Sequence, residues 1–194
     1  MQNNAYIFFG RSGSGKGTQA KLLQEHLKLK NKKVVYIETG QAFRDFINGD
    51  AHSQKLSKII MDKGELQPQF LAVWIWAGEL IEKLQGDEDV IFDGTPRRLT
   101  EAQLLNTALS FYGLAPHNIY LHIDHDEAVR RLLARGREDD KKLEGIEERL
   151  KWFQDEVVPA LEYYKKEPSH KFFTIDGVGS VETIQNSILE SLKI

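Results

Sequence analysis

The sequence has 194 residues, of which 41% are hydrophobic and 28% charged, so it is long enough for one domain with a sizeable core. Lys plus Arg number 26 and Asp plus Glu 29, and the formal charge of −3 argues against general binding to nucleic acid or membrane surfaces. The absence of cysteine excludes disulfides, thiolate zinc sites and a cysteine nucleophile. No apolar run approaches the roughly 20 residues of a membrane span, and the first residues carry no signal-peptide pattern. We therefore expect a cytoplasmic protein.

Short apolar runs alternate with longer helical patterns along the chain. The runs lack strict alternation of polar and apolar residues, which is typical of strands buried on both faces of a parallel sheet. They cover residues 5–9, 34–37, 90–92, 119–123 and 172–175. Helices are expected at about 15–29, 41–48, 53–62, 69–84, 100–111, 126–135, 146–164 and 181–192. This order predicts an open α/β three-layer fold, in which a five-stranded parallel sheet carries helices on both faces.

Two segments depart from simple alternation of strand and helix. The connection from residue 37 to residue 90 is much longer than one helix requires, which predicts a helical lobe inserted at residues 39–70. Residues 136–145 are polar and bracketed by glycines, which indicates a short surface loop or lid. No repeat or linker separates these parts, so residues 1–194 are expected to form a single domain.

The most informative motif is a glycine-rich loop, GRSGSGKGT, which runs from Gly10 to Thr18. It follows the first expected strand directly and opens the first expected helix. Glycines let backbone N–H groups curl around phosphate oxygens, and the helix N-terminus adds unpaired donors and a favourable dipole. Lys16 supplies a positive charge toward the β- and γ-phosphates of a nucleotide. The motif and its placement together predict a triphosphate site and place the α/β fold in the P-loop NTPase type.

The residue after the lysine is Gly17, where many P-loops carry the hydroxyl that binds Mg²⁺ directly, and Thr18 comes one place later. Mg²⁺ tolerates a site made mostly of phosphates and waters. Asp93, at the end of the third expected strand, is the natural carboxylate to orient those waters. The alternative for Asp93 is a strand-end residue that caps a turn.

In several ordered motifs the chain resembles the adenylate kinase family of nucleoside monophosphate kinases. The loop from Gly10 resembles the family's G-x-x-G-x-G-K-G-T-Q, with the threonine displaced in the same way. TGQAFR from Thr39 resembles T-G-D-x-x-R, and DGTPR from Asp93 resembles D-G-[FY]-P-R. Further matches are Arg131 with Arg135, the segment REDD from Arg137, Arg149, and Asp176-Gly177 after the last strand. The matches keep the family's order and cover nearly the whole chain.

This resemblance implies a role for each matching position. ATP would bind to Gly13, Ser14, Gly15, Lys16, Gly17, Thr18, Arg131, Arg135, Gly177 and Val178. The monophosphate would bind to Thr39, Gly40, Arg44, Glu65, Leu66, Gln67, Gly94, Thr95, Pro96, Arg97, Glu101, Arg137 and Arg149. The catalytic set would be Lys16, Arg97, Arg131, Arg135, Arg137 and Arg149, with Mg²⁺ held through water by Asp93. Arginines suit this task because their planar forks bind phosphate oxygens in pairs and stabilise the transferring group.

Four features depart from the family pattern. Gln41 stands where an Asp is usual, Thr95 where an aromatic residue is usual, and Glu101 where a base-reading Gln is usual. The fourth is the lid, which has only Gly136 between the arginines at 135 and 137 and leaves no room for a zinc-binding lid. These departures leave the acceptor base open.

Glu101 allows two interpretations. An ionised carboxylate only accepts hydrogen bonds, so it would suit the amino group of adenine or cytosine, or the two donors on the edge of guanine, but would oppose N1 of adenine. Alternatively, the side chain turns away toward Arg98. We expect AMP to remain a substrate, with relaxed base selectivity.

The function favoured by these residues is reversible, Mg²⁺-dependent transfer in which ATP and AMP give two ADP. A kinase for GMP, CMP or UMP, or a nucleotide-dependent binding or switch protein, is the alternative. ATP and a monophosphate are the expected partners of a monomer, without zinc, nucleic acid or membrane. Outside the motifs, Phe70, Trp74 and Trp76 are interpreted as core anchors of the inserted lobe, and His122 as a packed core histidine.

Overall fold

The sheet is all parallel, as the sequence predicts. In the computed structural model, which describes residues 2–136 and 143–194, its strands are β1 Asn4–Phe9, β2 Lys33–Glu38, β3 Glu88–Asp93, β4 Ala115–His122 and β5 Lys171–Asp176. Their spatial order is β2-β3-β1-β4-β5. β1 lies at the centre, where Ala5 is in register with Val90 of β3 and with Pro116 of β4. The prediction of a five-stranded parallel sheet is confirmed.

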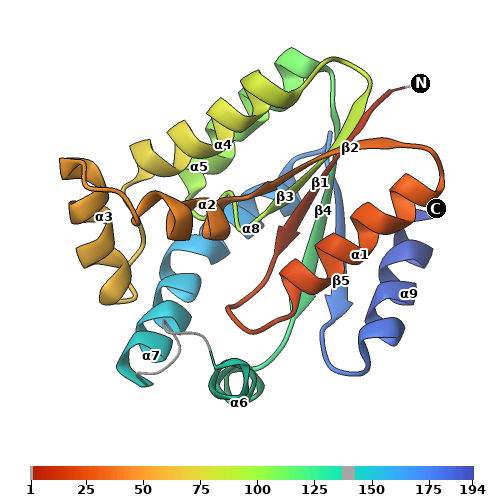
Figure 1. Cartoon of the computed structure of the whole chain (residues 1–194). Coiled ribbons are helices and arrows are strands. Elements are labelled where there is room, and N and C mark those ends of the chain that lie inside the picture. The colour runs from red at the N-terminus through yellow and green to blue at the C-terminus, as the bar shows by residue number, and fades with distance from the viewer. Residues whose placement is uncertain (1, 137–142) are drawn as a thin grey trace.

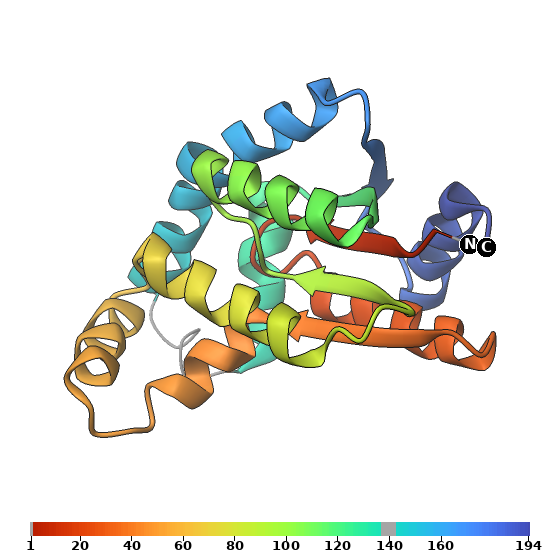
Figure 2. The ribbon, with the colours of Figure 1, turned by 90° about the horizontal axis from the view of Figure 1, so that it is seen from above.

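Helices cover both faces of this sheet (Figures 1 and 2). One face carries α1 Lys16–Leu29 and α9 Val181–Leu192, and the other carries α4 Gln69–Lys83, α5 Leu99–Tyr112 and α8 Val158–Lys166. Successive side chains of β1 explain this arrangement, because Tyr6 and Phe8 pack on the first face while Ile7 and Phe9 pack on the second. A strand that is buried on both faces reads as a continuous apolar run.

The long connection between β2 and β3 contains α2 Thr39–Phe46, α3 His52–Asp62 and α4. Figure 1 shows α3 standing away from the sheet at the end of α4. Phe43 of α2 packs with Leu71 and Ile75 of α4 in a small apolar cluster of its own. Helical segments thus occupy residues 39–70, where the sequence predicts an inserted lobe. The prediction that these residues move as one unit stays open.

Two helices flank the predicted lid. α6 His125–Arg135 and α7 Leu143–Trp152 pack together through Ala128 and Leu132 on one side and Ile146 and Leu150 on the other. Residues 137–142, and with them Arg137 and most of the predicted lid at 136–145, lie outside the described residues.

The single helix predicted at 146–164 is wrong. In its place α7 runs into a π-helical turn, η2 Phe153–Val157, which is followed by α8. Pro159 lies in the first turn of α8, and a proline has no N–H to continue the α-helical ladder from the preceding turn. The apolar spacing continues across this change of winding, so the sequence pattern alone does not reveal it.

Predictions for isolated side chains are partly wrong. Trp76 is buried in the main core, but Phe70 and Trp74 are exposed, and Trp74 stacks edge-on against Phe46. His122, the last residue of β4, is exposed and contacts the Tyr120 hydroxyl. Along residues 2–136 and 143–194, none of the helices combines the length and apolar character that a membrane span requires.

Candidate active site

A cavity of about 670 Å³ opens beyond the carboxyl ends of β1, β2 and β3. In an open α/β sheet, ligands bind outside these strand ends. The cavity collects side chains from α1, α2, α6 and α7 that are far apart in the sequence. Among the residues predicted for the site, it is lined by Gly13, Ser14, Gly15, Lys16, Gly17, Thr18, Gly40, Arg44, Glu65, Gln67, Asp93, Gly94, Arg97, Arg131, Arg135 and Arg149.

Other predicted residues lie at the margins of this cavity. A hollow of about 10 Å³ adjoins it and is lined by Thr39, Leu66 and Glu101, together with Phe43, Gln67, Ala72, Gly94, Arg97 and Arg98. Thr95 and Pro96 form the turn behind Arg97, and Thr95 is buried. Beyond β5 the cavity wall is made by Gly179, Val181 and Ile184, which the sequence reasoning missed in favour of Gly177 and Val178. Gly177 instead accepts a hydrogen bond from Arg131, and Val178 is exposed.

The phosphate loop presents backbone donors to the cavity. Gly15 is the residue before α1, in the left-handed conformation with φ +92°, and no side chain caps the first turn. The amides of that turn therefore remain available for an anion. Lys16 Nζ donates to the carbonyl oxygens of Gly10 at 2.8 Å and of Arg11 at 3.0 Å. Burial lowers the pKa of Lys16 to about 8, with Asp93 opposing and Arg97 adding to the shift.

Asp93 fits the predicted role beside a magnesium ion. Its side chain is only 7% exposed, and Oδ2 accepts a hydrogen bond from the Tyr36 hydroxyl at 3.1 Å. A Cβ at Gly17 would lie 3.0 Å from the same oxygen, so the carboxylate sits directly against the phosphate loop. Burial raises the pKa of Asp93, while Lys16 and Tyr36 lower it. A carboxylate at this place suits Mg²⁺, which prefers oxygen ligands and retains several waters.

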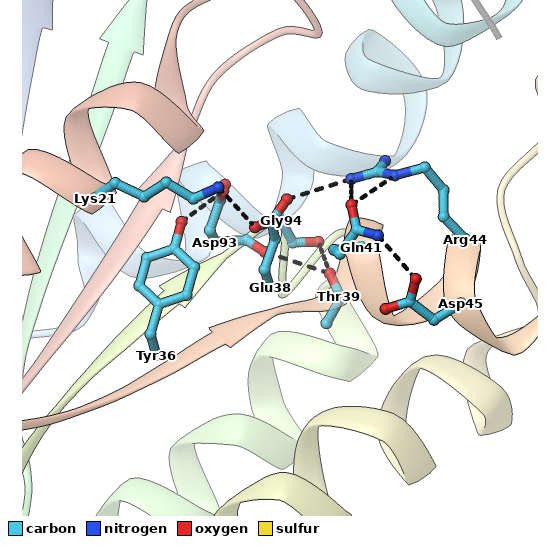
Figure 3. Close-up of polar contacts among 9 residues, drawn as sticks. All are labelled: Lys21, Tyr36, Glu38, Thr39, Gln41, Arg44, Asp45, Asp93 and Gly94. Atoms are coloured by element: carbon cyan, nitrogen blue, oxygen red, sulfur yellow. Dashed lines mark hydrogen bonds and ion pairs between the residues drawn. The ribbon is translucent and has the colours of Figure 1, made fainter. Parts of the chain in front are cut away.

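A chain of polar contacts joins α1 to α2 through Glu38, the last residue of β2 (Figure 3). Glu38 lies between two cations, with Lys21 Nζ 3.4 Å from Oε2 and Arg44 Nη2 3.3 Å from Oε1. Gln41 Oε1 accepts from Arg44 Nε at 3.0 Å, and its amide nitrogen donates to Asp45 at 2.8 Å. Gln41 thus supplies the acceptor that an Asp would supply to Arg44. The sequence reasoning missed Lys21, Tyr36 and Glu38, which carry no motif.

The turn after β3 positions Arg97. Thr39 Oγ1 donates to the carbonyl of Gly94 at 2.9 Å, and Arg97 Nε donates to the same oxygen at 2.7 Å. Gly94 has φ +86°, a conformation that favours glycine, and a Cβ there would lie 3.1 Å from Thr39 Oγ1, so the Thr39 side chain would have to shift. Glu101 turns toward this loop, toward Thr95 and the Arg97 amide, instead of toward Arg98.

Further arginines reach the cavity from α6 and α7. Arg131 Nε bonds Glu127 at 2.5 Å and Nη2 donates to Gly177 O at 2.9 Å. Arg149 is only 8% exposed, and its Nε donates to Gly145 O at 3.1 Å. Arg135 lies on the same side of α6 and also lines the cavity. Together with Arg97, they bring positive charge to the place where phosphate groups would meet.

Trp152 is a further residue that the sequence reasoning missed. The guanidinium carbon of Arg97 lies 5.5 Å from the centre of its ring, a geometry typical of cation–π contacts. Its indole N–H donates to Gly64 O at 3.1 Å, which joins the end of α7 to the segment after α3. One ring therefore contacts both the arginine and the predicted lobe.

The chain is similar in sequence to known proteins. The family model for adenylate kinases matches residues 8–169. The chain belongs to the adenylate kinase family. It is 34% identical over 189 residues to an adenylate kinase of Flavobacterium psychrophilum, covering 95% of each chain. With an adenylate kinase of Prochlorococcus marinus (strain SARG) it shares 36% identity over 191 residues, or 97% of this chain and 98% of the relative.

Family membership confirms the predictions of a P-loop fold and of an ATP-binding kinase that transfers phosphoryl groups. An adenylate kinase of Chlamydia trachomatis, 31% identical over 225 residues, covers 96% of this chain as well. In residues 2–136 and 143–194, no three His, Cys, Asp or Glu side chains gather in a way that could hold a metal ion. The roles of single site residues stay predictions.

Proposed function

We propose that the chain transfers the γ-phosphoryl group of ATP to AMP, giving two ADP, in a reversible reaction. The observation that supports this best is the convergence of the phosphate loop with Arg44, Arg97, Arg131 and Arg149 on one cavity. Two phosphate-bearing substrates repel each other, and the transferring group carries charge on its equatorial oxygens. Catalysis of such a step is mainly positioning plus electrostatic stabilisation, which clustered arginines provide.

ATP would lie with its phosphates on the amides at the start of α1. Lys16 would exchange the carbonyls of Gly10 and Arg11 for phosphate oxygens, which neutralises their charge. Mg²⁺ would be held by phosphates and by waters that donate to Asp93, itself fixed by Tyr36. The ion, when bound, offsets phosphate charge and orients the triphosphate.

AMP would lie on the other side of the cavity. Arg44 and Arg97 would bind its phosphate, with Thr39, Gly40 and Gly94 beside it, and the base would enter the region of Leu66. The phosphate oxygen that attacks is already anionic, so no general base is required. Arg131, Arg135 and Arg149 would surround the transferring group, and the resemblance adds Arg137, which lies outside the described residues.

The test is a coupled assay of MgATP against AMP, GMP, CMP and UMP. We expect transfer to AMP that requires Mg²⁺. Lys16→Ala should lower kcat by orders of magnitude, because the loss of one preorganised contact raises the activation free energy by roughly 3–4 kcal/mol. The variant should still unfold in a transition like that of the wild type. No transfer to any acceptor would exclude the proposal. Preference for GMP would favour a guanylate kinase, and binding without transfer would favour a switch protein.

We also propose that the protein is a cytoplasmic monomer, by analogy with small kinases of this kind. Sedimentation with and without both nucleotides tests the monomer, and a stable dimer in either condition would exclude it.

A further inference from the structure

Two positions at which the chain departs from the family pattern touch each other. Thr95 Oγ1 donates a hydrogen bond to Glu101 Oε1, and both residues are 1% exposed. The other carboxylate oxygen, Oε2, accepts from the backbone N–H of Arg97 at 2.9 Å. Both oxygens of Glu101 are therefore engaged by the loop that carries Arg97.

This engagement bears on how the acceptor base is recognised. A side chain reads a base through donors or acceptors that face the ligand. Glu101 borders the hollow beside Leu66, but its oxygens bond the loop. The Gln67 amide borders the same hollow and is also engaged, because it accepts from Ser57 Oγ at 2.7 Å and donates to Ser57 O at 2.9 Å. The polar groups of Glu101 and Gln67 are thus both hydrogen-bonded within the protein.

The loop presents a charged group at the wall of the cavity. Arg97 Nε donates to the carbonyl of Gly94 at 2.7 Å, so the position of the guanidinium depends on the conformation of this loop. Burial lowers the pKa of Arg97, and the carboxylates of Glu101 and Asp93 oppose this shift. Glu101 therefore fixes the backbone at Arg97 and also places negative charge near its guanidinium.

Building on the proposed function, we propose that Glu101 is a positioning residue that, with Thr95, anchors the loop presenting Arg97 to phosphate, and that it does not read the acceptor base. The pairing explains both departures at once. A phenylalanine at position 95 has no hydroxyl, and a tyrosine carries its hydroxyl at the far end of the ring, so Thr95 supplies at its γ position the donor that the buried Glu101 carboxylate requires.

The experiment compares Thr95→Val, Thr95→Ser, Glu101→Gln and the double variant Thr95→Val/Glu101→Gln with wild type. For each, kcat and KM are measured with AMP, GMP and CMP, and the unfolding midpoint is recorded. Thr95→Val leaves a buried carboxylate oxygen without its donor, so we expect kcat/KM for AMP to fall about tenfold or more. Thr95→Ser retains the hydroxyl and is the matched control, expected near wild type.

Glu101→Gln separates positioning from base reading. The Gln carbonyl can still accept from the Arg97 amide while its NH₂ donates to the Thr95 hydroxyl, so kcat/KM for AMP should stay within about threefold of wild type. The AMP:GMP:CMP ratio should not change. In the double variant the unpaired group is a neutral amide, which costs less to leave unpaired than a carboxylate, so part of the Thr95→Val loss should be recovered.

Two results overturn the proposal. One is a kcat/KM of Thr95→Val equal to that of wild type. The other is a change of more than about tenfold in the AMP:GMP ratio of kcat/KM in Glu101→Gln, equivalent to 1.4 kcal/mol of base discrimination. Transfer by wild type is measured first, so a failure of the proposed function is seen separately. In that case AMP affinity, measured by calorimetry on the same variants, replaces kcat/KM. If Thr95→Val does not fold, the base ratio of Glu101→Gln still decides.

Discussion

Lys16 has a charge that depends on pH near neutrality. Burial lowers its pKa to about 8, so the side chain is charged below that pH and loses its proton as the pH rises through it. Only the charged form attracts phosphate. We therefore expect kcat/KM for ATP, which reports the free enzyme, to fall above a pH of about 8, whereas kcat should decline only at higher pH because bound phosphates favour the charged lysine.

The measurement is a pH profile of both parameters at constant ionic strength and saturating Mg²⁺. Lys16→Arg is the matched control, because a guanidinium stays charged over the whole range. Its profile should lose the decline, whatever its absolute rate. A wild-type kcat/KM that is level to a pH of about 9.5 would contradict the assignment.

The Glu38 carboxylate lies close to where the acceptor's phosphate would bind, and both groups are negatively charged. It bonds Arg44 at 3.3 Å and lines the cavity, so the acceptor must draw Arg44 away from it. We expect Glu38→Gln to lower KM for the monophosphate by about fivefold, on the order of 1 kcal/mol for a partly exposed charge pair, with kcat little changed. Asp45→Asn is the control, because Asp45 bonds Gln41. A higher KM in Glu38→Gln would mean that Glu38 orients Arg44 productively.

At the scale of elements, Trp152 joins α7 to the lobe. Its N–H bonds Gly64 O at 3.1 Å, and its ring lies 5.5 Å from Arg97. Trp152→Phe removes the donor and keeps an aromatic ring, so we expect KM for AMP to rise severalfold, about 1 kcal/mol for one hydrogen bond. Trp152→Leu removes both contacts and should also lower kcat. Equal kinetics for the two variants would show that the ring does not support Arg97.

The strands and most helices could be predicted because their signals are local. Buried parallel strands give continuous apolar runs, and Asp124 caps α6 by accepting from the Glu127 amide. The turn η2 Phe153–Val157 could not be predicted, because helix winding can change while apolar spacing continues. The exposure of Trp74 was also missed. Its ring contacts Phe46 of α2, a different segment of the chain, so the local pattern of α4 does not reveal where the Trp74 side chain lies.

At the scale of the molecule, the motif residues of the site could be predicted because a phosphate loop and clustered arginines have sequence signatures. Tyr36 and Glu38 could not, because their roles arise only when the ends of β2 and β3 lie side by side. The bond between Thr95 and Glu101 was missed although both residues were noted as departures. A six-residue separation does not by itself indicate that a turn folds one side chain onto the other.

Motion of the whole molecule should be dominated by the lobe. Phe43 of the lobe packs with Leu71 and Ile75 of α4 in a small cluster that is separate from the main core, and segments with few core contacts open at low cost. Closing the lobe over AMP would bring Arg44 to the phosphate and exclude water, which would otherwise hydrolyse ATP. The segment 136–145 is short, so we expect smaller displacement beside it.

Distance measurements between paired labels test this expectation. The chain has no cysteine, so introduced cysteines are labelled uniquely at exposed positions. Lys28→Cys on α1 serves as the common reference, paired with Lys55→Cys on α3 or with Glu144→Cys on α7. A bisubstrate analogue should shorten the distance to position 55 markedly and change the distance to position 144 less. Equal, large changes at both would show that α7 moves as far as the lobe, and no change at position 55 would contradict closure of the lobe on binding.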